Sequence, residues 1–206
     1  MENVRLFNPL DKKNLGKSIV EALLESNESA LSSVIPFEGA GIYAIYYRGG
    51  FKQYRELAVL NKMAGSYPIY VGKAIPKGGR KGVDTDASLD SDALFKRLQD
   101  HKKSITSTAS LSISDFSYRC LILDDIWISL GEALVLQKYQ PLWNQVIEGF
   151  GNHDPGAGRY GGMRPSWDEV HPGRLWAAKC KRPKVDLLGL LDLIQVYMKT
   201  TLLAGR

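Results

Sequence analysis

The run from Gly41 to Arg48 constrains the fold more than any other segment of this chain. It reads Gly-Ile-Tyr-Ala-Ile-Tyr-Tyr-Arg and stops at the pair Gly49-Gly50. β-Branched and aromatic residues bounded by glycine are typical of a strand. Side chains alternate along a strand, so Tyr43 is expected on one side of a sheet and Ile42 on the other.

The remaining pattern of apolar residues predicts a mixed α/β chain. Helical spacing and strand-like runs predict helices over 8–25, 54–64, 91–103, 130–139 and 185–203, and further strands over 67–73 and 116–123. Residues 74–92 carry glycines, Pro76 and aspartates with few apolar side chains, which is the composition of a long mobile loop. We therefore expect a small, mainly antiparallel three-stranded sheet flanked by helices, with the run Ala133-Leu134-Val135-Leu136 buried.

The composition is that of an ordinary globular protein with a mild positive charge. Of its 206 residues 44% are hydrophobic, and 27 Lys and Arg against 22 Asp and Glu give a net charge of +5. No stretch approaches the roughly 18 apolar residues of a membrane span, and the amino terminus lacks the pattern of a signal peptide. We expect a cytoplasmic protein without membrane contact, in which Cys120 and Cys180 are reduced thiols. The net charge alone favours a polyanionic partner only mildly.

Polar side chains on regular elements are the candidates for chemistry. Arg97 and His101 are four positions apart and share one helix face, although a simple surface pair would look the same. Glu132 lies in a helix that is otherwise almost entirely apolar, where a carboxylate is costly to bury unless it meets a cation or a metal. Tyr43 and Tyr70 could each be a core tyrosine with a satisfied hydroxyl group. Taken singly, none of these residues requires a function.

The order of these groups is more specific than any one of them. Over residues 41–144 the chain carries, in sequence, Gly41-Ile42-Tyr43, Tyr70-Val71-Gly72, Arg97, His101, Glu132 and Asn144. This ordered set resembles the GIY-YIG nuclease superfamily. Val71 replaces the usual isoleucine, a change between β-branched residues that leaves the chemistry intact. The wide separation of the two tyrosines indicates an insertion at 49–66.

The resemblance implies hydrolysis of phosphodiester bonds with one Mg²⁺ in each active site. Glu132 would hold the metal, which prefers oxygen ligands and keeps several of its waters. Arg97 would contact the scissile phosphate, and Asn144 would hold the geometry of the metal site or of the phosphate. A positioned water and positive charge on the phosphate oxygens are the elements that this reaction needs.

The resemblance also assigns the proton acceptor to a small cluster. Tyr43 would orient and deprotonate the attacking water, with Tyr70 in the same polar cluster. His101 could accept or relay the proton, because the ordinary pKa of histidine lies near neutrality whereas that of tyrosine is near 10. Whether Tyr43 or His101 is the base stays open at this point.

From residue 149 onward the chain is rich in glycine, arginine and tryptophan. Segments 150–159 and 167–176, with 8–16, resemble small type II restriction endonucleases of the superfamily that cut GC-rich six-base-pair palindromes. Arginine can read guanine bidentately and glycine lets the backbone approach DNA. The candidates for DNA contact are therefore Arg159, Arg164 and Arg174, with Lys73 beside the phosphate. The alternative is that the arginines pin the loop to the core through carboxylates such as Asp154 and Asp168. His153 and His171 lack the partner spacing of metal ligands.

These inferences combine into one expectation. The chain would comprise a helical extension over 1–40, a nuclease core over 41–148 and a DNA-recognition lobe with a closing helix over 149–206, packed as one unit. It would be a type II restriction endonuclease that cuts double-stranded DNA at a palindrome such as CCGCGG and leaves 5′-phosphate ends. A two-fold site predicts a homodimer, and the restriction role implies a cognate DNA methyltransferase. The alternatives are a homing or DNA-repair nuclease of the same superfamily, and a DNA-binding module without catalysis.

Overall fold

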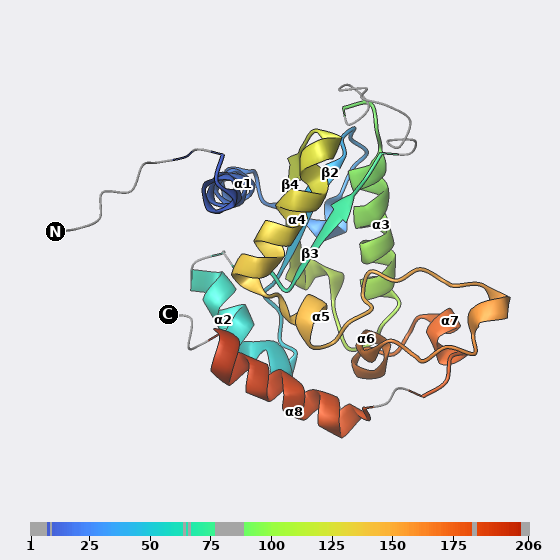
Figure 1. The fold of residues 1–206 in the computed structure, drawn as a ribbon. Coiled ribbons are helices and arrows are strands. Elements are labelled where there is room, and N and C mark those ends of the chain that lie inside the picture. Colours follow the sequence, from blue (N-terminus) through green and yellow to red (C-terminus); the bar gives the residue numbers. More distant parts are fainter. Residues whose placement is uncertain are drawn as a thin grey trace.

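A four-stranded antiparallel sheet forms the centre of the computed structural model, which describes residues 8, 10–63, 65, 67–76, 89–182 and 185–202 (Figure 1). The strands lie in the order β1-β4-β2-β3. Their bounds are Ser29–Ala30 for β1, Gly41–Tyr47 for β2, Tyr70–Ala74 for β3 and Phe116–Ile122 for β4. The expected α/β fold with an antiparallel sheet is thus confirmed.

The count of three strands was one too low. The additional strand, β1, is only two residues long and pairs Ser29 with Tyr118 at the edge of the sheet. Two residues cannot show the alternation of apolar and polar side chains by which a strand is recognised in a sequence.

The helices cover both faces of this sheet. Their bounds are Lys12–Glu25 for α1, Arg55–Met63 for α2, Ala93–Thr106 for α3, Asp125–Tyr139 for α4, Leu142–Gln145 for α5, Ser166–Val170 for α6, Leu175–Ala178 for α7 and Leu187–Tyr197 for α8, which continues as a π-helical turn over Met198–Leu202. Short 3₁₀ turns lie at Leu31–Ser33, Lys52–Tyr54, Ile113–Asp115 and Ala157–Arg159. None of the helices described is long and apolar enough to cross a membrane.

Strand β2 is buried along its whole length because helices pack on both of its faces. Tyr43, Ile45 and Tyr47 share one face and form a core with α3. Ile42, Ala44 and Tyr46 share the other face and form a second core with α1 and α4. Figure 1 shows α3 on one side of the sheet and α1 and α4 on the other.

Helix α4 differs from its predicted form at its start and in its burial. It begins at Asp125, because the side chain of Asp124 accepts a hydrogen bond from the backbone N–H of Ile126 and caps the helix. The apolar run over 133–136 was expected to be buried. Only Val135 of this run is buried, and Ala133 is exposed. The helix lies on the sheet with one face only, so its other face is left to the solvent.

The segment after α5 shares the core on the Tyr43 side of the sheet. Phe150 and Trp167 are fully buried and join Trp143 of α5, with ring centroids 4.5 Å apart for Trp143 and Phe150 and 5.1 Å apart for Phe150 and Trp167. Most of the predicted mobile loop over 74–92 lies outside the described residues, which stop at 76 and resume at 89.

Candidate active site

The pairing of strands β2 and β3 places the two motif tyrosines side by side. Tyr43 lies opposite Gly72, and Tyr70 lies opposite Ile45. The centroids of the two tyrosine rings are 6.2 Å apart. A Cβ at position 72 would overlap the hydroxyl group and the ring of Tyr43. The glycine of the second motif is therefore required by the close passage of the Tyr43 ring over the neighbouring strand.

Tyr43 forms a hydrogen bond with His101, which α3 presents to the same face of the sheet. The Tyr43 Oη and His101 Nε2 atoms are 2.6 Å apart, and both side chains are buried. Burial lowers the pKa of His101 well below its ordinary value, and the charge of Arg97 lowers it further. Both effects favour the neutral imidazole, and in the tautomer with its proton on Nδ1 the Nε2 atom accepts from the tyrosine hydroxyl group.

Both tyrosines are held in their neutral form by their surroundings. Burial raises the pKa of Tyr43 well above its ordinary value, and Tyr70 adds to this effect while the charge of Arg97 opposes it. The pKa of Tyr70 is raised by burial as well, again against the opposing charge of Arg97. Neither tyrosine is a phenolate before substrate binds. The Tyr43 oxygen could therefore accept a proton only if its own hydroxyl proton moved to another group.

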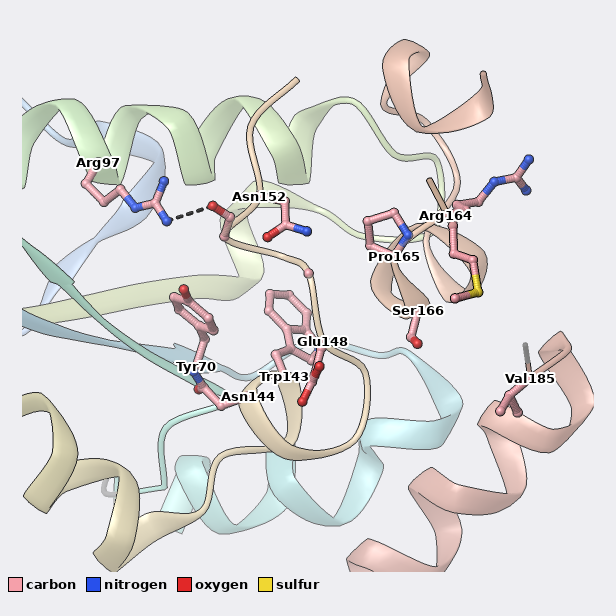
Figure 2. Close-up of a pocket in the computed structure, with 13 residues that line it drawn as sticks. Tyr70, Arg97, Trp143, Asn144, Glu148, Asn152, Arg164, Pro165, Ser166 and Val185 are labelled. Carbon is pink, nitrogen blue, oxygen red and sulfur yellow. Dashed lines mark hydrogen bonds between the residues drawn. The ribbon is translucent and has the colours of Figure 1, made fainter. Parts of the chain in front are cut away.

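Arg97 lies one helical turn before His101 and points toward the segment that follows α5. Its Nη2 atom donates to the carbonyl oxygen of Gly151 at 2.7 Å, and its Nη1 atom donates to Nε2 of His153 at 2.5 Å. Figure 2 shows this bond as a dashed line, with the Tyr70 side chain below the guanidinium group at the same end of the cavity. The predicted pairing of Arg97 and His101 on one helix face is present, although neither is an ordinary surface residue.

Glu132 of α4 forms an ion pair with Lys73 of β3. The Glu132 Oε2 and Lys73 Nζ atoms are 2.8 Å apart, and Lys73 also donates to Oγ of Ser129 at 3.3 Å. Glu132 was expected to be buried, but 20% of its side chain is exposed. The reason is the partial exposure of α4 described above. The Glu132 carboxylate lies beside a cavity, and a cation that binds it there would compete with Lys73.

Asn144 holds strand β3 from the start of α5. Its Oδ1 atom accepts from the backbone N–H of Val71 and its Nδ2 atom donates to the Val71 carbonyl oxygen, both at 2.9 Å. This amide was expected to hold the geometry of the metal site or of the phosphate. The structure pairs it with the residue between Tyr70 and Gly72, so Asn144 positions the second tyrosine motif.

Two cavities meet at Tyr70 and Arg97. One, of about 600 Å³, extends along Trp143, Asn144 and the segment after α5 and is drawn in Figure 2. The other, of about 960 Å³, is lined by Lys73, Glu132 and residues of α3. Arginine, lysine, tyrosine and glutamate side chains thus converge on one open space that can take a phosphate group.

The donors present fit Mg²⁺ held by a single carboxylate. Within the described ranges no group of three or more His, Cys, Asp or Glu side chains could hold a metal ion. Mg²⁺ usually keeps several waters and binds through one or two carboxylates together with substrate phosphate. Glu132 offers one such carboxylate, and the cavity beside it leaves room for water and phosphate ligands.

The three arginines proposed for DNA contact have different surroundings. Arg174 is buried and directs all five of its N–H donors to Asp168 and to three backbone carbonyls, so it cannot reach DNA, and the pinning alternative is correct for this residue. Arg164 is partly buried and donates to Glu169 and to the Ala177 carbonyl. Arg159 is exposed on its 3₁₀ turn.

The sequence analysis missed the contribution of the segment after α5 to the site. The Phe150 ring stacks on His101 with centroids 4.4 Å and planes 17° apart. Gly151 and His153 are the partners of Arg97, although His153 was considered only as a metal ligand. The available signal was the motif Gly149-Phe150-Gly151-Asn152-His153, in which two glycines flank an aromatic residue directly after the catalytic core.

Comparison with known protein families agrees with this arrangement. A family model described as the Eco29kI GIY-YIG domain matches residues 35–198. The match begins before β2, ends after α8 and includes every residue of the ordered set. Among curated proteins, no relative matches the chain.

Proposed function

The chain belongs to the Eco29kI GIY-YIG domain family, a family of type II restriction endonucleases, and we propose that it hydrolyses double-stranded DNA at a short palindromic site with the help of Mg²⁺. One observation carries the proposal. Tyr70, Arg97, Lys73 and Glu132 line one cavity, and the hydrogen-bonded pair of Tyr43 and His101 is buried beside Tyr70, with the two tyrosine ring centroids 6.2 Å apart. This arrangement provides a proton acceptor and positive charge at the place where a phosphate group would lie.

Tyr43 and His101 act as a unit in this proposal. The attacking water gives its proton to the Tyr43 oxygen as the Tyr43 hydroxyl proton moves to Nε2 of His101, so that no buried phenolate accumulates. Burial lowers the pKa of His101, which leaves the imidazole neutral with a free lone pair but makes it a weak base in the absence of substrate. The negative charge of a bound phosphate beside Arg97 would raise that pKa and favour the transfer. The proton acceptor is therefore the pair, and Tyr43 is its member nearest the water.

Arg97 and Lys73 supply the positive charge. Arg97 carries a permanent charge, and a guanidinium group matches the oxygens of a phosphate in geometry. Lys73 sits at the end of the second tyrosine motif, 2.8 Å from Glu132. Preorganised cations at developing negative charge are the largest source of acceleration in such sites.

Glu132 would hold one Mg²⁺ through its carboxylate. When bound, this ion supplies Lewis-acid stabilisation of the phosphate and of the leaving 3′ oxygen. Attack of water on phosphorus with breakage of the P–O3′ bond would leave 5′-phosphate and 3′-hydroxyl ends.

The segment from residue 149 onward would read the site. Exposed Arg159 and partly buried Arg164 remain the candidates for contact with bases or phosphates, since arginine recognises guanine edges bidentately. A GC-rich sequence such as CCGCGG remains the proposed target. A palindromic site is most simply bound by a homodimer with one active site per subunit, and a methyltransferase of the same specificity would protect host DNA.

A digest of a sequenced plasmid with Mg²⁺, followed by mapping of the fragment ends, tests this proposal. Discrete fragments with 5′-phosphate ends at one short palindrome are expected. Cutting at a long asymmetric site, or only on damaged DNA, would instead assign the chain to the homing or repair nucleases. Shifted bands in a gel without any metal-dependent cutting would assign it to the DNA-binding modules.

A further inference from the structure

The segment Gly149–His153, which we call the bridging loop, connects the proposed DNA-reading lobe to the catalytic groups. It follows α5 and its Trp143 and passes over the side of α3 that carries Arg97 and His101.

The middle of the loop touches the catalytic residues directly. The Phe150 ring stacks on His101, which fixes the plane of the imidazole that bonds to Tyr43. The Gly151 carbonyl accepts from Arg97. A Cβ at position 151 would lie 2.5 Å from Oη of Tyr70 and 2.8 Å from Nη2 of Arg97, so a larger residue there would displace one or both of these side chains.

The end of the loop inserts His153 between two residues of α3. Its Nε2 atom accepts from Arg97 at 2.5 Å, and its Nδ1 atom lies 3.9 Å from Oδ2 of Asp100. Arginine has donors only, so Nε2 must be the acceptor and the proton of the neutral imidazole must be on Nδ1. That proton faces the Asp100 carboxylate, one turn of α3 after Arg97.

The beginning of the loop is fixed by Arg174 from the lobe. The guanidinium group forms a buried ion pair with Asp168, with Nε 2.6 Å from Oδ1, and a second bond from Nη2 to Oδ2. Its remaining donors bind the carbonyl oxygens of Gly149 at 2.9 Å, and of Phe150 and Asn152 at 3.0 Å each. One side chain of the lobe thus sets the backbone path of the loop.

We propose that the bridging loop positions Arg97 for the scissile phosphate, with His153 as the positioning residue at its end and Arg174 as its anchor. The inference rests on the proposed nuclease function. The two loop acceptors take one N–H of Nη1 and one of Nη2, and the hydroxyl groups of Tyr43 and Tyr70 lie beside the same guanidinium group, so a phosphate would bind the N–H donors that face the cavity. Because Arg97 borders both cavities, a guanidinium fixed in this way already faces the space beside Lys73 and Glu132.

The test compares His153→Ala and His153→Gln with the wild type on a plasmid fragment that carries one mapped site. DNA affinity is measured with Ca²⁺ in place of Mg²⁺, and the cleavage rate is measured in a single turnover with protein in excess. Misplacing a catalytic group by about 1 Å costs about 100-fold in rate. We expect His153→Ala to cut at least about tenfold more slowly with unchanged affinity, and His153→Gln, whose amide oxygen can accept from Arg97, to recover most of the rate.

Asp154→Ala is the matched control. Its exposed carboxylate binds only the Gly156 N–H and the Tyr160 hydroxyl among the residues described, so cleavage should stay at the wild-type rate. Arg174→Lys keeps the charge but not the fork of donors, and should slow cleavage in the same way as His153→Ala. If this buried variant fails to fold, the exposed His153 variants still decide the question.

A measurement without DNA accompanies the kinetics. Bonds at both Nη atoms should slow rotation of the Arg97 guanidinium group, which gives separate ¹⁵N side-chain signals that Arg97→Lys removes. His153→Ala should merge them. A wild-type protein that cuts no DNA overturns the proposed function. If the wild-type protein cuts DNA and His153→Ala cuts at the same rate, or differs only in a weaker DNA affinity, this inference alone is overturned. It is also overturned if His153→Ala cuts faster, since the loop would then have blocked Arg97.

Discussion

Replacing Tyr43 with phenylalanine removes one oxygen atom from the centre of the site. The ring and its packing against Gly72 stay, while the 2.6 Å hydrogen bond to His101 is lost and Nε2 of His101 is left buried without its partner. A buried group left unpaired costs about 1–3 kcal/mol. For a chain of this length we expect Tm to fall by about 3–10 °C.

The expected effect on catalysis is much larger than the effect on stability. A positioned general base contributes about 10²- to 10⁴-fold to a rate, which corresponds to about 3–5 kcal/mol of activation free energy. Tyr43→Phe should therefore slow single-turnover cleavage by at least about 100-fold, with DNA affinity in Ca²⁺ unchanged.

Tyr47→Phe provides the matched control for this experiment. Tyr47 lies on the same face of β2, is buried to the same degree, and loses one hydrogen bond, from the backbone N–H of Phe51 at 2.7 Å. Its Tm should fall by a similar amount while the cleavage rate stays within about threefold of wild type. If Tyr43→Phe cuts no more slowly than Tyr47→Phe, Tyr43 takes no part in activating the water.

Three further predictions concern the supports of the site. Asn144→Ala removes both hydrogen bonds to Val71 and should lower the free energy of unfolding, measured in urea, by about 2–4 kcal/mol. A loss below about 0.5 kcal/mol would show that these two bonds do not stabilise the fold. Burial lowers the pKa of His171 to about 3 in the folded chain. Below about pH 6.5 the unfolded chain therefore binds a proton on this histidine that the folded chain does not bind, and the free energy of unfolding falls as the pH drops. The loss should be about 1.4 kcal/mol per pH unit, and urea melts of His171→Asn between pH 6.5 and 5 should show a flatter profile than wild type. Lys73→Met frees the Glu132 carboxylate and should lower the Mg²⁺ concentration for half-maximal cleavage, whereas an unchanged concentration would show that the ion pair does not compete with the metal.

The sequence predicted the site residues that lie on regular strands and helices. The alternation along β2 places Tyr43 on the α3 face, and the four-residue spacing on α3 brings Arg97 and His101 to the same side. Both patterns are local and depend only on the geometry of a strand or a helix. The antiparallel sheet follows from the same local signals, apart from the two-residue edge strand.

The sequence could not predict contacts made by irregular segments. Arg174 was expected to touch DNA because nothing in the sequence shows that Asp168 and three backbone carbonyls surround it. Asn144 was expected to hold the geometry of the metal site or of the phosphate, but the sequence does not show that its partner is the backbone of a strand 73 positions earlier in the chain. The exposure of Glu132 depends on how α4 lies on the sheet. The spacing of apolar residues along this helix does not show which of its faces packs against the strands.

Cleavage by Glu132→Gln tests the central claim most directly. The substitution keeps the size of the side chain and removes the charge that would hold Mg²⁺. Wild-type protein should cut supercoiled plasmid into discrete fragments with Mg²⁺ and not with EDTA. Glu132→Gln should bind the same DNA with equal affinity and cut it at least about 100-fold more slowly at every Mg²⁺ concentration. Metal-dependent cutting by Glu132→Gln at the wild-type rate would contradict the account.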